Sequence, residues 1–413
     1  MNNISNTENF SSVVHQLTEK YATLWRELPD TMPESSRRFT PWQQRENERK
    51  LESHLKEIST SFELNEGVPD ADKPHISLDA IKAILGSSLL SHDLLGNRYF
   101  EESERATKRF VREAREFDST LSESDIHQAF RNLWVFNSIQ MIFGREIELT
   151  PSSFAYSLLY PVTDNGLDSS GRTSDDKRAY VGWLSRWFED GYCQPVDDWT
   201  EKTAELLLMI EQEYPRPEFC NVYLSLQAIH EAQTKSLLLQ NIPPGYNEED
   251  LTAITIEKGG TSVLVDGFLA AGCLNLAEAD SFFEYGVLLQ LIDDLRDVDE
   301  DRTNGHSTPF LRMVEGDGLD GCTQQLLFFV THCAKKLSNL NRNHVLQIRE
   351  MVEQSCSFLI LETVARHREF YSKRFLRKVE PRMPLRSAFL RELHRDIQLR
   401  HAQRSVLAGF ERV

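Results

Sequence analysis

The stretch YGVLLQLIDDLRDVDED, Tyr285–Asp301, decides the fold, because an apolar run leads directly into six acidic residues. Its apolar spacing predicts a helix, on which residues four apart lie on one face. Asp293, Asp297 and Asp301 therefore form a ladder along that face. Stacked like charges cost roughly a few tenths of a kcal/mol per pair on an exposed helix. A bound Mg²⁺ would reverse that cost, since carboxylate oxygens are its preferred ligands.

A second carboxylate pair with the same spacing, Asp164 and Asp168, follows the apolar run FAYSLLY. If both segments are helices, their acidic ends can face one another across a cavity mouth and hold several Mg²⁺ ions with a diphosphate. The alternative is a solvated helix end for either segment, or a turn at Asp-Asn-Gly after Asp164. The shared spacing and the apolar run before each pair favour the metal site.

Composition and charge limit the classes of function. A formal charge of −18 and a pI near 5.2 argue against a broad nucleic-acid or anionic-membrane surface. The chain has no apolar stretch of about 20 residues and no signal-peptide pattern at its start. Six cysteines without a C-x-x-C pair predict free thiols in a reducing compartment. We therefore expect a cytoplasmic protein without a nucleic-acid partner or stable membrane insertion, and a homodimer is left open.

Helical spacing covers almost every long segment, so we predict an all-α protein. One large helical domain is expected at 76–413, after a leader at 1–75 with one or two helices and polar connectors. Pro161 should kink or break its helix shortly before the first acid pair. Gly259 and Gly260 should weaken or break the helix predicted at 248–272.

These segments resemble the class I isoprenoid synthase superfamily, which comprises trans-prenyltransferases, squalene and phytoene synthases, and class I terpene cyclases. LLQLIDDLRD is similar to the second Asp-rich motif of the prenyl synthases, and its Gln290 stands three residues before the D-D-x-x-D. DNGLD fits the D-x-x-x-D frame of the first motif but carries Asn165 where the prenyl synthases have Asp. That departure weakens a chain-elongating interpretation and brings the segment closer to the large-terpene (sesquarterpene-type) synthases.

Three segments together, SFAYSLLYPVTDNGLD, IEKGGTSVLVDGFLAAG and LLQLIDDLRDVDEDRTNGHSTPF, resemble a poorly characterised bacterial branch of this superfamily. The resemblance covers roughly residues 100–375. It implies a single helical bundle around a central apolar cavity, with about three Mg²⁺ ions at the mouth. The expected metal ligands are Asp164, Asp168, Asp293, Asp297 and Asp301, and the expected catalytic residues are Asp164, Asp168, Asp293, Asp294 and Asp297.

The resemblance also implies residues that contact the diphosphate. Prenyl synthases place a Lys and a hydroxyl residue at a place comparable to EKGGTS, where the glycine pair would open the helix toward phosphate. A surface Lys beside a flexible break is the alternative there. A loop after the acids, RTNGHST, could fold over the diphosphate. The expected diphosphate-binding residues are Lys258, Thr261, Ser262, Gln290, Arg302 and His306.

Three functions follow in order of preference. The first is a Mg²⁺-dependent class I terpene synthase that ionises an allylic isoprenyl diphosphate and cyclises the carbocation. The second is a prenyltransferase that passes the cation to another substrate, by head-to-tail elongation or by squalene- or phytoene-type head-to-head condensation. The third is a non-catalytic helical protein that binds an isoprenoid or a partner protein.

Overall fold

The computed structural model describes residues 7–33, 37–64, 92–168, 171–237, 247–305, 308–316, 318–341 and 344–396. Within these ranges all the regular secondary structure is helical, which confirms the all-α prediction. The long helices are α1 (Thr7–Glu27), α2 (Pro41–Leu64), α4 (His92–Phe117), α5 (Glu123–Ile142), α6 (Pro151–Asp168), α7 (Ser174–Asp190), α8 (Asp198–Glu213), α9 (Cys220–Ser236), α10 (Glu248–Ala271), α11 (Leu276–Arg296), α14 (Asp320–Ser338) and α15 (Val345–Arg366).

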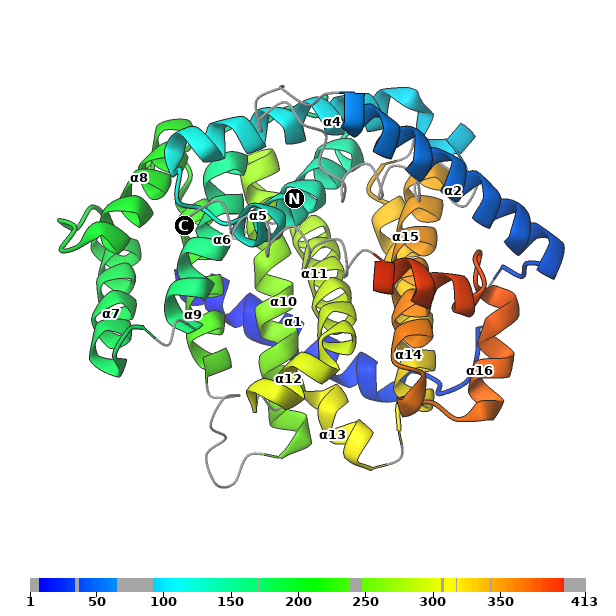
Figure 1. Cartoon of the computed structure of the whole chain (residues 1–413). Helices are drawn as coiled ribbons and strands as arrows, with labels where there is room; N and C mark the ends of the chain where they lie inside the picture. Colours follow the sequence, from blue (N-terminus) through cyan, green and yellow to red (C-terminus); the bar gives the residue numbers. More distant parts are fainter. Residues whose placement is uncertain are drawn as a thin grey trace.

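Short helices join and follow the long ones. They are α12 (Val298–Asn304), α13 (Pro309–Glu315) and α16 (Lys373–Val379), with 3₁₀ turns η3 (Arg368–Phe370) and η4 (Glu380–Arg382) and a final helix at 387–396. Helix α4 crosses one end of the central helices, and α12 and α13 lie at the other end (Figure 1). This second end carries the acidic segments.

Helix α1, which the sequence assigns to the leader, packs into the same apolar core as the later helices. Its side chains Phe10, Tyr21 and Trp25 are buried in a cluster that extends to α15 and beyond. Aromatic contacts join Tyr21 to Phe283 of α11 and Trp25 to Phe329 of α14, with ring centroids 5.9 Å and 6.4 Å apart. The predicted domain boundary at residue 75 lies outside the described residues, but α1 itself is part of the helical core.

Neither of the two predicted helix breaks occurs, whereas the alternatives of a kink at Pro161 and a weaker helix at the glycine pair stay predictions. Helix α6 runs without interruption through Pro161 to Asp168, and α10 runs through Gly259 and Gly260 to Ala271. The proline and glycine penalties of an isolated helix are outweighed here by tertiary packing, since both helices lie in the core. The two glycines have a positive use, because they allow α10 to approach α11 closely.

The helix predicted over Tyr285–Asp301 is divided. Helix α11 begins at an N-cap, Asn275, whose side chain accepts the backbone N–H of Glu278 in a capping box. It ends at Asp297, and α12 follows after this change of direction. The one-turn spacing of the acidic ladder survives the change. The backbone N–H of Asp297 donates to the carbonyl of Asp293 at 2.9 Å, and that of Asp301 donates to Asp297 at 2.8 Å.

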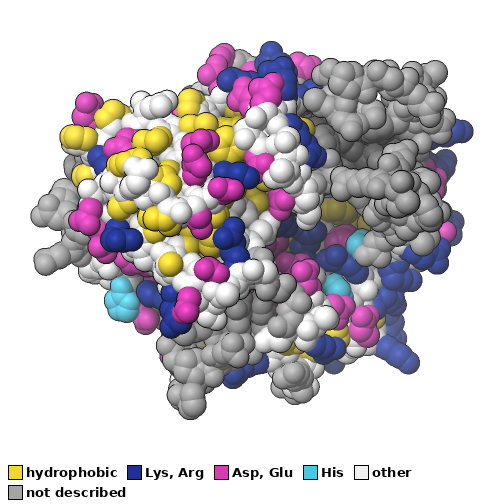
Figure 2. Space-filling model, turned by 60° about the vertical axis from the view of Figure 1, so that its left-hand side comes forward, with side chains coloured by type: hydrophobic (Ala, Val, Ile, Leu, Met, Phe, Trp, Pro, Cys, Tyr) yellow, Lys and Arg dark blue, Asp and Glu magenta, His cyan; other side chains and the backbone are white. Residues whose placement is uncertain are grey.

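The surface of the described part of the chain carries mixed charge. On the face in Figure 2, acidic and basic side chains are interspersed with hydrophobic ones, and Lys and Arg side chains gather along the lower right edge of the coloured surface. None of the described helices is long and apolar enough to span a bilayer. All six cysteines are free thiols.

Candidate functional site

The two acidic segments line one cavity of about 630 Å³. Asp164 comes from the C-terminal end of α6, and the other acids come from the end of α11 and from α12. The walls are completed by the beginning of α5, the end of α9 and the first half of α10. Six acidic residues line the cavity: Asp164, Asp293, Asp294, Asp297, Glu300 and Asp301.

A glycine contact between α10 and α11 brings the two helices together beside the cavity. A Cβ atom on Gly286 would lie 2.1 Å from the carbonyl oxygen of Gly259, and a Cβ on Gly259 would lie 2.4 Å from Cβ of Gln290. Only hydrogen fits at either position. Because Lys258 precedes Gly259 directly, this crossing places Lys258 and Gln290 on the wall of the same cavity.

The described lining of the cavity includes one Arg and one Lys, each next to a predicted metal ligand, and one His, His127. A guanidinium nitrogen of Arg131, on α5, lies 3.3 Å from a carboxylate oxygen of Asp293. Lys258 Nζ lies 3.9 Å from a carboxylate oxygen of Asp164. Among the described lining residues, one Arg and one Lys face six acids, so this part of the cavity carries excess negative charge.

Burial and this excess charge shift the acids. Burial raises the pKa of Asp294 to about 7, against a hydrogen bond that one oxygen accepts from Gln290 at 2.7 Å. Burial, and then the charge of Asp293, raise the pKa of Asp297 to about 6. The negative charge of Asp164, followed by burial, raises the pKa of the Tyr160 phenol above its ordinary range. Burial and, to a lesser extent, neighbouring negative charge therefore disfavour the ionised forms of Asp294 and Asp297.

The residues present fit a hard divalent cation. All six acids offer oxygen ligands, which suit Mg²⁺ and not soft metals. Asp294 is only 8% exposed, and its second carboxylate oxygen is buried without a hydrogen-bond partner among the described residues. A bound cation would satisfy that oxygen and lower the repulsion among its neighbours.

Several predicted residues lie elsewhere or outside the described part. Thr261 is fully buried, and its hydroxyl donates to the carbonyl of Glu257 at 2.7 Å. Ser262 donates to the carbonyl of Gly259 at 2.9 Å. Neither residue lines the cavity, so the expectation that the EKGGTS hydroxyls face it is not met. They satisfy their own helix, which the glycines do not open.

The predicted loop after the acids does not supply a basic group from its described part. Arg302 lies outside the cavity lining, with its guanidinium 5.1 Å from the ring centroid of Phe370. His306 and the side chain of Asp168 lie outside the described residues. Thr308 is the residue of this segment that reaches the cavity wall.

Arg131 is the main residue of the cavity wall that the sequence analysis did not single out. A signal was present, because Ser124, His127, Gln128 and Arg131 follow the i, i+3, i+4, i+7 pattern of one helix face, and all four line the cavity. From α9, Gln233 also lines it, and its buried side-chain nitrogen has no hydrogen-bond partner among the described residues. This polar stripe on the otherwise apolar helix α5 could have predicted a cavity-facing side.

The cavity lining is mostly polar. Leu167 and Leu237 are its aliphatic members among the described residues. The aromatic side chains Phe282 and Phe283, which follow the N-terminal end of α11, are fully buried in the core. The central apolar chamber implied by the resemblance therefore stays a prediction.

A separate group of possible ligands lies beside the cavity. The side chains of Asp299, His367 and Glu369 place one ligand atom each within 4.8 Å of one another. The Nδ1 atom of His367 lies 2.8 Å from Asp299, which is half exposed. An ion pair of this kind explains the contact without a metal.

No family model, no curated protein and no solved structure matches this chain. What the cavity does chemically is therefore argued from its own residues.

Proposed function

We propose that this protein is a Mg²⁺-dependent class I terpene synthase that ionises an allylic isoprenyl diphosphate and cyclises the resulting carbocation. One observation carries the proposal. Asp164 and the Asp293 ladder, which are 129 positions apart in the chain, line one acidic cavity together with two basic residues. This is the arrangement that the resemblance of the two motifs predicts.

Each group of the cavity has a part in this chemistry. The carboxylates of Asp164, Asp293 and Asp297 would hold Mg²⁺, and Asp294 would contribute its unpartnered oxygen. When bound, Mg²⁺ would supply positive charge that stabilises a departing diphosphate. Lys258 and Arg131 would add charge-assisted hydrogen bonds to the phosphate oxygens. No general base is needed to begin the reaction.

Asn165 favours cyclisation over chain elongation. Prenyl synthases carry a second Asp at the corresponding place in the motif. Here the Asn165 amide donates a hydrogen bond to Asp125 at 2.5 Å. An amide held in this way offers no charged ligand, so the first acidic segment contributes fewer carboxylates than an elongating enzyme would use. Prenyl transfer remains the second candidate, and its product would be a longer diphosphate or a head-to-head hydrocarbon.

The test is a substrate panel with purified protein. Geranyl, farnesyl, geranylgeranyl and longer isoprenyl diphosphates are incubated with Mg²⁺, with a parallel set in excess chelator. Pyrophosphate release and extracted hydrocarbons are then measured. We expect Mg²⁺-dependent release from at least one substrate, with a cyclic product. Asp293→Asn should abolish this release, whereas substitution of the exposed Asp190 at the end of α7, Asp190→Asn, should not. Absence of release from every substrate contradicts the proposal and favours a non-catalytic binding protein.

A further inference from the structure

The two cations of the cavity occupy the carboxylates that the proposed function assigns to the metal. Arg131 pairs with Asp293 at 3.3 Å and Lys258 with Asp164 at 3.9 Å. The pairs join different helices, α5 to α11 and α10 to α6. In both cases a basic side chain that could bind phosphate is held by an acid that could bind Mg²⁺. One carboxylate oxygen cannot make both contacts at full strength.

The metal should displace the guanidinium from Asp293. A Mg²⁺ ion approaches a carboxylate oxygen to about 2.1 Å and carries two charges, whereas the Arg131 contact is longer and joins half-exposed groups, with 51% of the Arg131 side chain and 32% of Asp293 accessible. Such a pair contributes little free energy. Coordination also withdraws the negative charge that attracts the guanidinium.

A released Arg131 would have donors available for an anion. The guanidinium has five N–H donors, and among the described residues it makes one hydrogen bond, to Asp293. Its nearest charged and titratable neighbours are the acids Asp293 and Asp297 and the Tyr160 phenol. Once metal neutralises those acids, a diphosphate is the group in this cavity that the guanidinium fits, because it can bind phosphate oxygens in pairs.

We propose that Arg131 is a diphosphate-binding residue that pairs with Asp293 until Mg²⁺ takes that carboxylate. The inference rests on the proposed function and adds an order of events to it. Arg131 competes with Mg²⁺ and cooperates with diphosphate, so one side chain has opposite effects on two ligands. The metal thereby prepares the cation that receives the phosphate, and diphosphate binding before the metal is disfavoured.

The test uses calorimetric titrations of the full chain with Mg²⁺ alone, and then with inorganic pyrophosphate at saturating Mg²⁺. In Arg131→Gln, the affinity for Mg²⁺ alone should rise about two- to fivefold, because Mg²⁺ no longer has to break a partly exposed ion pair. The affinity for pyrophosphate should fall about tenfold or more, since a charge-assisted hydrogen bond is lost. A purely structural role of Arg131 would lower both affinities together.

The control is Arg178→Gln on α7, which removes a more exposed ion pair, with Asp175, away from the cavity. Both of its affinities should equal those of the wild type. If Arg131→Gln does not fold, Arg131→Met is titrated in its place, because it removes the charge and keeps most of the side-chain volume.

The outcomes separate the inference from the proposed function. The inference is overturned if the Arg131 variant binds Mg²⁺ no more tightly than wild type, or binds pyrophosphate as tightly as wild type. In either case the proposed function still stands if the wild-type protein binds both ligands. A wild-type protein that binds neither Mg²⁺ nor Mg²⁺ with pyrophosphate overturns both.

Discussion

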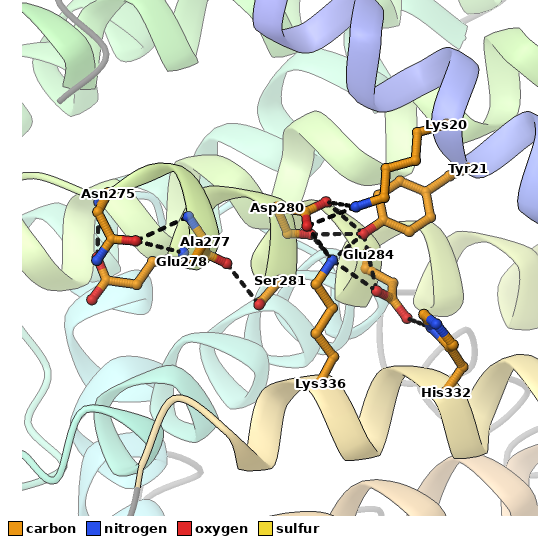
Figure 3. A network of polar contacts seen from close by, with 10 residues as sticks. All are labelled: Lys20, Tyr21, Asn275, Ala277, Glu278, Asp280, Ser281, Glu284, His332 and Lys336. Carbon is orange, nitrogen blue, oxygen red and sulfur yellow. Dashed lines mark hydrogen bonds and ion pairs between the residues drawn. The ribbon is translucent and has the colours of Figure 1, made fainter. Parts of the chain in front are cut away.

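The two ends of α11 carry acid pairs with the same spacing in opposite electrostatic surroundings. Near its N-terminal end, Asp280 and Glu284 are enclosed by partners from two other helices (Figure 3). The carboxylate of Asp280 forms ion pairs with Lys20 of α1 and Lys336 of α14. The distances from its oxygens to the two Nζ atoms are 2.7 Å and 2.5 Å. Glu284, which is fully buried, accepts Lys336 at 3.2 Å. Two further bonds to Glu284 come from Tyr21 at 3.0 Å and His332 at 2.6 Å.

At the C-terminal end of the same helix, Asp293 and Asp297 have no such set of partners among the described residues. Arg131 contacts Asp293, and the pKa of Asp297 is raised by burial and by its neighbour. The first pair is neutralised by the fold, so its role is to hold α1 and α14 against α11. The second pair leaves charge for something outside the chain to neutralise. A ligand site is thus marked by missing cations and not by clustered acids.

The largest expected effect tests the neutralised pair. Glu284→Ala removes the buried acceptor that Tyr21, His332 and Lys336 share and leaves the Lys336 charge under-compensated. We expect the free energy of unfolding to fall by about 3 kcal/mol, the lower range for breaking a buried charge pair. Urea denaturation followed by circular dichroism measures it, with exposed Glu189→Ala as the control. A loss below about 1 kcal/mol would mean that this network does not hold the helices together.

The glycine contact beside the cavity gives the next largest effect. In Gly286→Ala the new methyl group meets the carbonyl of Gly259 at 2.1 Å, so the two helices must separate. Overpacking of this kind costs about 1–3 kcal/mol. The control is Gly182→Ala on α7, where a Cβ meets nothing within 4 Å and where alanine should instead stabilise the helix by up to about 1 kcal/mol. Equal unfolding midpoints for the two variants would exclude a tight crossing.

The contrast between the two ends explains how far the sequence could lead. Apolar spacing and acid spacing were local properties, so the all-α class and the acidic ladder could be predicted. Neutralisation is not local. The partners of Asp280 and Glu284 come from positions as distant as Lys20 and Lys336, and no pattern near residue 284 announces them. By spacing alone, Asp280/Glu284 is as good a metal pair as Asp293/Asp297.

The glycine break that does not occur and the residue that the sequence did not single out share the same physical cause. Gly259 and Gly260 were read by their helix propensity, yet their effect depends on Gly286 and Phe283 across the crossing, where added Cβ atoms would clash. Arg131 was overlooked because its importance comes from Asp293 on another helix. Propensity describes a segment alone, and the site is formed between segments.

A further acid differs from both pairs, because it is buried without a cation among the described residues and does not line the cavity. Asp266 on α10 is fully buried, and one of its oxygens accepts Asn132 at 3.3 Å while the other has no partner among the described residues. Burial raises its pKa well above the ordinary value. The folded state therefore keeps a proton that the unfolded state loses above about pH 4, so stability falls as pH rises from there toward the folded pKa.

Asp266→Asn should remove this pH dependence. Between pH 5 and pH 8 the wild type should lose stability relative to the variant. The difference in their free energies of unfolding should change by at least about 1 kcal/mol over this range, the equivalent of one pKa unit. Urea denaturation at the two pH values measures the difference. Mg²⁺ should not alter it, since Asp266 does not line the cavity. An identical pH response in both proteins would show that Asp266 is ionised when folded.

The substitution with the smallest expected effect on stability, Asp297→Asn, tests most directly whether the C-terminal end of α11 binds a metal. Asp297→Asn removes one charge from a repelling set, so the metal-free protein should become more stable by roughly a few tenths of a kcal/mol. Its affinity for Mg²⁺ should fall about tenfold or more, because even an outer-shell change costs a metal site that much. Thermal unfolding with and without Mg²⁺ shows both effects.

The matched control lies at the other end of the helix. Asp280→Asn removes an acid that Lys20 and Lys336 neutralise, so it should lower stability and leave the Mg²⁺ response intact. Opposite signs of the stability change, with loss of the Mg²⁺ response only at Asp297, are what unequal neutralisation requires. If Mg²⁺ stabilises Asp297→Asn as much as wild type, the excess charge at this end does not serve a metal, and the two acid pairs differ only in exposure.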